Sequence, residues 1–242
     1  MAIPFNQRNF QKELDKFVLK LQEEKKVPTI LLHSCCAPCS SHCIEYLSQY
    51  FRVTVFYYNP NISYEEEYRK RVEEEKRFIK EFPTKYPVEF IEGDYDTSKF
   101  YDMAKGLEKC PEGGERCFKC YELRLRETAK LAKEKGFDYF TTTLSISPLK
   151  SSLKLNEIGL KLEEEYGMKY LLSDFKKKNG YKRSIELSKE YNLYRQNFCG
   201  CVYSRVEKKD SSRLARESCA PDSGLLQQTN SCPNPCASSR SV

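Results

Sequence analysis

Closely spaced cysteines are the residues in this sequence whose types and spacing point most directly to chemistry. Cys35 and Cys36 are adjacent and follow an apolar run at residues 29–33. Two neighbouring thiols are poorly suited to a hydrophobic core, whereas thiolates bind soft metals well. An apolar run followed by Pro38 and a periodic segment is typical of a buried strand that leads into a helix. We therefore expect the pair at a strand-to-helix turn, where α/β enzymes hold their ligands.

A second pair, Cys117 and Cys120, has the spacing at which two thiolates reach one metal ion or neighbouring corners of a cluster. With Cys35 and Cys36 it makes four sulfur ligands, which fit either structural zinc or an iron-sulfur cluster. Adjacent cysteines favour the cluster, because zinc ligands are typically separated by about two to four residues. The alternative for Cys35 and Cys36 is a pair of buried small hydrophobes. That simple interpretation is preferred for three other cysteines: Cys39, Cys43 and Cys110.

The third pair, Cys199 and Cys201, has a single glycine between its members. A disulfide across one residue closes a very small ring, and strained disulfides are the labile, exchange-active ones. Gly200 would supply the backbone angles that such a closure needs. A redox-active pair is thus one interpretation, and two further metal ligands or two inert thiols are the others.

Alternating apolar runs and amphipathic segments predict an α/β protein with a doubly wound, mostly parallel sheet and helices on both faces. We expect strands at residues 27–33, 52–58, 88–91, 137–144 and 169–175, and helices at residues 7–25, 38–50, 63–82, 121–135 and 156–166. The many charges of the 63–82 helix are interpreted as a solvated face. The carboxyl ends of all strands should meet at one edge, which would receive Cys35, Cys36, Asn59, Asp94, Ser145 and Asp174.

Composition narrows the class of protein. The chain has 242 residues, of which 39% are hydrophobic and 31% charged, and its net charge is +6. No apolar stretch approaches the roughly 20 residues that span a bilayer, and the N-terminus lacks a signal-peptide pattern, so we expect a cytoplasmic protein without membrane contact. Thiols stay reduced in that compartment, so 12 cysteines indicate metal or redox chemistry. The mild positive charge permits an anionic partner without identifying one.

The chain is expected to form a single catalytic domain over residues 1–210. From residue 211 onward Ser, Gln, Asn and Pro replace the aromatic and charged residues, and periodicity is lost. We therefore expect residues 211–242 to be a disordered tail. Its three cysteines, Cys219, Cys232 and Cys236, are left out of the site.

Five motifs, taken together, resemble the QueH family of epoxyqueuosine reductases. They are His33-Ser34-Cys35-Cys36-Ala37-Pro38-Cys39, Tyr58-Asn59-Pro60-Asn61-Ile62, Glu115-Arg116-Cys117-Phe118-Lys119-Cys120, Thr141-Thr142-Thr143-Leu144-Ser145, and Tyr194-Arg195-Gln196-Asn197-Phe198-Cys199-Gly200-Cys201. The resemblance runs from about residue 27 to residue 206, and the order of five separated motifs makes it specific. Ser63 departs from it, since a histidine is common there.

The resemblance implies a HUP/PP-loop-like fold and reduction of the epoxide of epoxyqueuosine at the tRNA wobble position to give queuosine. It implies a 4Fe-4S cluster held by Cys35, Cys36, Cys117 and Cys120, and a redox-active disulfide between Cys199 and Cys201. Cobalamin is not expected. The partners are tRNA carrying epoxyqueuosine and an external electron donor.

Four cysteines would saturate the cluster, so an additional mononuclear iron is one way to place a Lewis acid on the epoxide oxygen. Carboxylates suit a harder iron site, and the candidates are Asp94, Asp96 and Asp174. The alternative for each aspartate is a cap of a helix or a turn.

Phosphate contacts need Lys and Arg, and an extruded base needs an aromatic surface to stack on. The basic and aromatic segment after residue 175 supplies the tRNA-binding candidates: Lys177, Lys178, Lys182, Arg183 and Arg195, with Lys150 and Lys154 as further ones. Two other functions stay open. A PP-loop type tRNA-modifying enzyme should have a phosphate-binding loop rich in glycine after the first strand, and a zinc-stabilised nucleic-acid-binding protein should be colourless.

Overall fold

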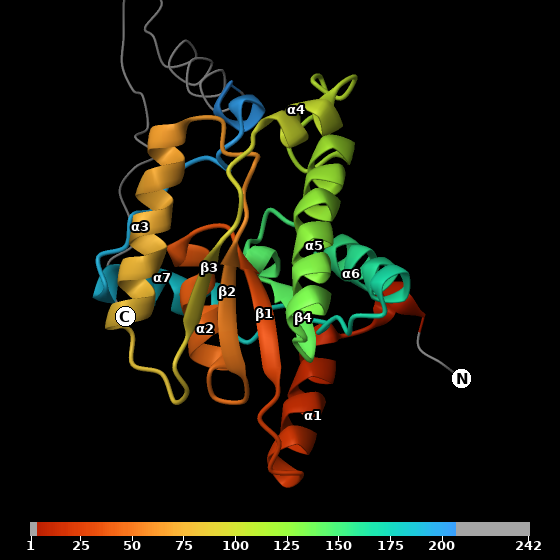
Figure 1. The fold of residues 1–242 in the computed structure, drawn as a ribbon, viewed down its shortest axis with the longest axis vertical. Helices are drawn as coiled ribbons and strands as arrows, with labels where there is room; N and C mark the ends of the chain where they lie inside the picture. The colour runs from red at the N-terminus through yellow and green to blue at the C-terminus, as the bar shows by residue number, and fades with distance from the viewer. Residues whose placement is uncertain (1–3, 207–242) are drawn as a thin grey trace, which may run out of the picture.

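The computed structural model describes residues 4–206, with a four-stranded sheet at the centre (Figure 1). The strands are β1 (Thr29–Ser34), β2 (Arg52–Tyr57), β3 (Glu89–Glu92) and β4 (Tyr139–Thr142). Their order is β3-β2-β1-β4, and every neighbouring pair is parallel. The chain builds outward from β1 through β2 to β3 and then returns to the other side of β1. Strand order therefore reverses beside β1, and ligands of open α/β sheets bind at such a switch point.

Helices cover both faces of the sheet, as predicted (Figure 1). Ile30 and Leu32 of β1 pack in one core with α1 (Phe10–Glu23), α2 (Ala37–Leu47) and Phe78 of α3 (Glu65–Glu81). Leu31 packs in the other core with α5 (Glu115–Lys135) and α6 (Ser152–Tyr166). Successive side chains of a strand point to opposite faces, so β1 contributes to both cores. The predicted fold class is confirmed.

The predicted fifth strand at residues 169–175 is wrong. An isolated bridge between Phe140 and Tyr170 joins this segment to β4, and the Thr141 hydroxyl donates to the carbonyl oxygen of Leu171 at 2.9 Å. The side chain of Asn156 in α6 donates to the carbonyl oxygen of Ser173 at 2.9 Å and accepts from the Ser173 amide at 3.1 Å. These backbone groups are therefore not available for pairing with a neighbouring strand. The Tyr170 ring packs directly over Gly159, where an added Cβ would lie 2.2 Å from the ring. Contacts with α6 thus replace strand pairing.

Helix α5 begins six residues earlier than the predicted start at Tyr121. Its first turn is stabilised by Arg116, whose guanidinium donates to the carbonyl oxygens of Leu107 and Glu108 at 3.1 and 2.9 Å. These bonds hold the preceding loop against the helix. As a result Cys117 and Cys120 lie on the helix itself.

Four short elements were not predicted: η1 (Phe5–Gln7), α4 (Ser98–Ala104), η2 (Thr143–Ile146) and α7 (Gly180–Glu190). Helix α7 packs against α2, and the Arg183 guanidinium binds both carboxylate oxygens of Glu45. The η2 turn continues directly from β4. The predicted tail at 211–242 lies outside the described residues, so the proposed domain boundary stays a prediction.

Candidate active site

The loop between β1 and α2 carries three cysteines whose sulfurs meet. Cys35 follows the last residue of β1, Cys36 is the N-cap of α2, and Cys39 lies in its first turn, which begins with Ala37 and Pro38. The sulfurs of Cys35 and Cys36 are 3.9 Å apart, and all three lie within 4.8 Å of one another. In the part of the chain that the structure describes, this is the only group of three or more cysteine, histidine or acidic ligand atoms at that spacing.

Hydrogen bonds distribute charge unequally over these three thiols. The Cys36 and Cys39 thiols hold the pKa of Cys35 well below its usual range, and burial opposes this effect. The same contacts with Cys35 raise the pKa of Cys36 and of Cys39. Three sulfurs at this spacing form a soft donor set of the kind that binds transition metals.

Sequence reasoning placed Cys39 among the ordinary buried thiols, and the structure brings it to the site. Its side chain is half-buried and lines the same cavity as Cys35. A signal was present in the sequence, because Cys36 and Cys39 themselves have the spacing that puts two thiols on one turn. Cys43, one turn further along α2, is fully buried and donates to the carbonyl oxygen of Cys39, as expected of a structural thiol.

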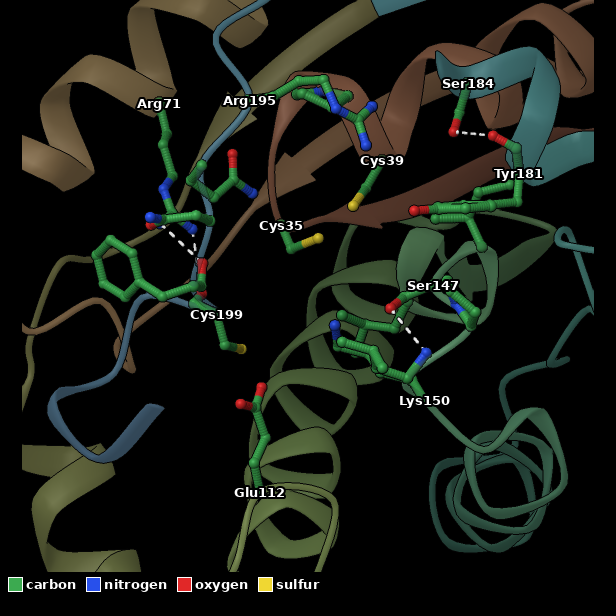
Figure 2. Close-up of a pocket in the computed structure, with 18 of the residues that line it drawn as sticks. Cys35, Cys39, Arg71, Glu112, Ser147, Lys150, Tyr181, Ser184, Arg195 and Cys199 are labelled. Carbon is green, nitrogen blue, oxygen red and sulfur yellow. Dashed lines mark hydrogen bonds between the residues drawn. The ribbon is translucent and has the colours of Figure 1, made fainter. Parts of the chain in front are cut away.

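A cavity of about 350 Å³ lies beyond the carboxyl end of β1 (Figure 2). Cys35 and Cys39 line it from one side and Cys199 from another, and their side chains are directed into the same space as Lys150. Its wall contains further charged or polar groups, among them Arg71, Glu112, Arg124, Tyr181, Arg195 and Gln196. The cavity thus combines thiols with positive charge.

A second, smaller cavity adjoins the first. Cys117 and Cys120 of α5 line it together with Cys199 and Cys201, and Cys120 packs against Cys201. Cys199 and Arg124 line both cavities. The structure therefore brings all three predicted pairs to one region, although Cys117 and Cys120 do not join the close group formed by the β1–α2 loop.

Arg124 of α5 stands between the two groups of cysteines. Its Nε donates to the carbonyl oxygen of Cys120 at 3.2 Å and its Nη1 to Oδ1 of Asn59 at 3.3 Å, whereas its buried Nη2 has no hydrogen-bond partner among the described residues. Burial disfavours the cation, but the surrounding thiols Cys120, Cys199 and Cys35 raise the pKa of Arg124. A fully buried arginine with a free donor implies a compensating negative charge.

His33 is part of the scaffold rather than a ligand. Burial lowers its pKa to about 3, so the ring is neutral. Nε2 then donates to the carbonyl oxygen of Tyr58 at 3.1 Å, and Nδ1 accepts from the Thr142 hydroxyl at 2.9 Å. These bonds join the ends of β1, β2 and β4 just below the Cys35 loop.

Known proteins share most of this sequence. The family described as epoxyqueuosine reductase QueH matches residues 30–207. The chain belongs to the QueH family. It is 43% identical over 203 residues to epoxyqueuosine reductase QueH of Streptococcus pyogenes serotype M1, covering 83% of this chain and 80% of that protein. The protein of the same name from Staphylococcus epidermidis is 43% identical over 204 residues, which are 83% and 86% of the two chains. That of Thermotoga maritima is 37% identical over 188 residues, 75% and 93% of the two.

The three aspartates considered for an additional iron in this QueH protein line neither cavity. Asp94 and Asp96 are exposed, and Asp96 accepts from the amide and hydroxyl of Ser98 at the start of α4. Asp174 is buried and forms an ion pair with Lys176 at 2.7 Å. Asp96 thus binds the first turn of α4, as the capping alternative expected, whereas Asp174 forms an ion pair.

Of the five basic residues considered for tRNA binding, Arg195 lines the larger cavity, and it donates to the Ser188 hydroxyl at 2.9 Å. The others lie elsewhere. Lys178 is paired with Asp15, Lys182 with Glu186, and Arg183 with Glu45, whereas Lys177 is exposed. Lys150 also lines the cavity, but Lys154 is paired with Glu157 at 3.0 Å. None of the helices in residues 4–206 is long and apolar enough to cross a membrane.

Proposed function

We propose that this QueH protein reduces the epoxide of epoxyqueuosine at the tRNA wobble position to give queuosine. The observation that carries the proposal is the cavity of about 350 Å³ into which Cys35, Cys39 and Cys199 converge from distant parts of the chain. Thiols there can deliver electrons or bind a metal that does so, and the positive groups suit an anionic substrate and a leaving oxygen. The reaction takes place in the cytoplasm, and an external donor restores the electrons.

The donor set fits a metal cofactor. The close sulfur group of the β1–α2 loop and the CxxC pair of α5 offer soft ligands, and the partnerless Nη2 of Arg124 fits beside an anionic cluster. We propose a 4Fe-4S cluster with Cys35, Cys36, Cys117 and Cys120 as its ligands. Such a cluster would transfer electrons one at a time. The sulfur of Cys39 lies within 4.8 Å of those of Cys35 and Cys36, so it is a further thiol beside two of these ligands.

Lys150 supplies positive charge where the epoxide oxygen would leave. Its half-buried side chain enters the cavity from the loop after η2, opposite Cys35 (Figure 2). Although burial disfavours the ammonium, the thiols Cys199, Cys35 and Cys39 raise its pKa, so the charge is retained. An ammonium directed at a developing alkoxide stabilises it electrostatically.

The Cys199 and Cys201 dithiol supplies the two electrons and two protons of the overall reaction. Both C–O bonds of the epoxide break, a carbon–carbon double bond forms, and the oxygen leaves as water. The dithiol becomes a disulfide, which the external donor reduces again. Both cysteines are free in the structure, and Cys199 lines the cavity that holds Lys150.

The test is direct conversion. Protein purified without oxygen is incubated with tRNA carrying epoxyqueuosine and a chemical reductant, and the digested nucleosides are weighed by mass spectrometry. We expect a nucleoside lighter by one oxygen, with iron and sulfide in the protein. Absence of conversion by iron-loaded protein would overturn the assignment, and colourless, zinc-containing protein would favour the zinc-stabilised alternative.

A further inference from the structure

The loop of residues 198–202, which carries Cys199 and Cys201, is held by a buried arginine of α3. The Arg71 side chain is 1% exposed. Its Nη1 donates to the carbonyl oxygen of Cys199 at 3.1 Å and its Nη2 to that of Phe198 at 3.5 Å. The opposite edge of the guanidinium binds Glu67, with Nε at 2.8 Å and Nη2 at 2.7 Å. Glu67 therefore orients the guanidinium, and the remaining donors bind the backbone of the loop.

Ser63, in the segment before α3, binds the same loop on both sides of Cys201. The Ser63 amide donates to the carbonyl oxygen of Gly200 at 3.1 Å, and the Ser63 hydroxyl accepts from the Val202 amide at 3.0 Å. Gly200 has φ +120°, and an added Cβ would lie 2.9 Å from Ile62 and 3.3 Å from Arg71. The loop thus lies directly against the residues that bind it.

These contacts belong to the dithiol form, because both cysteines of the loop are free. A disulfide between them would bring the sulfurs to about 2.05 Å, and across one residue this changes the torsions of the peptides in between. Those peptides carry the Cys199 and Gly200 carbonyl groups, which Arg71 and the Ser63 amide bind, and the Val202 amide, which the Ser63 hydroxyl binds, follows them directly. Hydrogen bonds that are stronger in the dithiol form than in the disulfide form shift the equilibrium toward the dithiol.

We infer that Arg71 and Ser63 set the reduction potential of the Cys199/Cys201 pair by binding the backbone of residues 198–202 in its dithiol conformation. They are positioning residues, since they act through the loop. The inference rests on the proposed function in one respect, because it takes the pair as the electron source. It concerns an equilibrium of the protein itself, which is measurable without tRNA.

Equilibration with glutathione measures this equilibrium. The dithiol and one glutathione disulfide give the protein disulfide and two glutathione thiols, so atoms and electrons balance. Removing contacts that favour the dithiol raises the equilibrium constant for oxidation. We expect a rise of about tenfold for Arg71→Met, equivalent to a potential about 30 mV more negative, and a smaller rise, roughly threefold, for Ser63→Ala, which loses one neutral hydrogen bond.

The variants separate charge from geometry. Arg71→Lys keeps the positive charge but loses the planar set of donors, so we expect only partial restoration. Arg69→Met is the matched control, since Arg69 lies two residues away on α3 with an exposed side chain paired with Glu65 and Glu92. Ser63→Ala removes a single acceptor, so it tests the inference even if the buried Arg71 position does not tolerate substitution.

The redox state of the pair can be measured on a single peptide, because an arginine lies on each side of it. Cleavage after Arg195 and Arg205 releases a peptide of residues 196–205, whose only cysteines are Cys199 and Cys201. Metal-loaded protein is equilibrated without oxygen at a series of ratios of reduced to oxidised glutathione. It is then quenched in acid and alkylated, and mass spectrometry of the peptide gives the fractions of dithiol and disulfide.

Shifts in both Arg71 and Ser63 variants with an unchanged control support the inference. If the wild-type pair is oxidised by glutathione disulfide but neither variant has a changed equilibrium constant, the inference is overturned and the proposed reaction is unaffected. A wild-type pair that stays dithiol at every ratio overturns the inference together with the role of the pair as the electron source.

Discussion

The side-chain amide of Gln196 donates a hydrogen bond to the sulfur of Cys36 at 2.8 Å. It connects the segment that carries Cys199 to the loop between β1 and α2, 160 residues away in sequence. We expect Gln196→Ala to lower turnover about fivefold, as the loss of roughly 1 kcal/mol from one hydrogen bond would do. Turnover with a chemical reductant measures this, and Gln49→Ala, at an exposed glutamine in the turn between α2 and β2, is the control. Unchanged turnover would show that the bond has no role.

Cys39 and Cys43 lie one turn apart on α2, and only Cys39 lines the cavity. We expect Cys39→Ser to reduce bound metal, because its sulfur is within 4.8 Å of those of Cys35 and Cys36. Cys43→Ser should retain metal, although it replaces a fully buried thiol. Iron and sulfide analysis of the two purified proteins compares them. Equal metal content would remove Cys39 from the site.

Lys150 is expected to act on the chemical step. Lys150→Met should lower the rate by about a hundredfold, since preorganised charge at a leaving oxygen is typically worth that much. Lys150→Arg should recover part of it, and Lys154→Met, at a residue paired with Glu157 outside the cavity, should leave it unchanged. Single-turnover measurement of nucleoside conversion separates this effect from tRNA binding. A Lys150→Met protein with a wild-type single-turnover rate would contradict the role.

Glu75 of α3 is fully buried, and burial raises its pKa to about 8. The folded protein therefore binds this proton more tightly than the unfolded chain, whose glutamates titrate near 4.5. The free energy of unfolding should fall as pH rises from about 4.5 to about 8 and then level off. Glu75→Gln should remove this dependence. Denaturant unfolding of the wild type and of Glu75→Gln at pH 6 and pH 8.5 tests this. An equal fall in the free energy of unfolding in both proteins would contradict a protonated, buried Glu75.

Arg195 is the basic residue of the C-terminal segment that reaches the cavity, whereas Lys182 and Arg183 are paired with acidic side chains. We expect Arg195→Ala to weaken tRNA binding about tenfold and to flatten its salt dependence, because one phosphate contact is lost. Lys182→Ala is the control. Binding isotherms at several salt concentrations give both quantities, and an unaltered salt slope would exclude a phosphate contact by Arg195.

Much of the fold could be predicted, because β1 and β2 are short apolar runs with clear ends. The predicted strand at 169–175 failed because Asn156, distant in sequence, binds the backbone of Ser173. No local pattern carries that information. The charges of α3 were interpreted as a solvated face, yet Arg71 and Glu75 are buried. Their burial depends on the 198–202 loop and on α2, which the helix period alone does not reveal.

The cysteine pairs could be found from spacing, but their grouping could not. Spacing shows which thiols share a turn, and it led us to leave out Cys39 because that residue also fits a packing face of α2. Arg124 was likewise indistinguishable from a surface arginine, since its burial depends on contacts with Cys120 and Asn59 made only in the folded chain.

The two segments that carry the proposed cluster ligands belong to opposite layers of the molecule. Cys36 and Cys39 move with α2, which packs on one face of the sheet, and Cys117 and Cys120 move with α5 on the other. The width of the gap between the two sulfur groups is therefore determined by the thickness of the sandwich. A volume change in the core between β1 and α5, for example at Ala129, would change the separation of the two sulfur groups, so mutations far from any thiol would alter that separation without unfolding the chain.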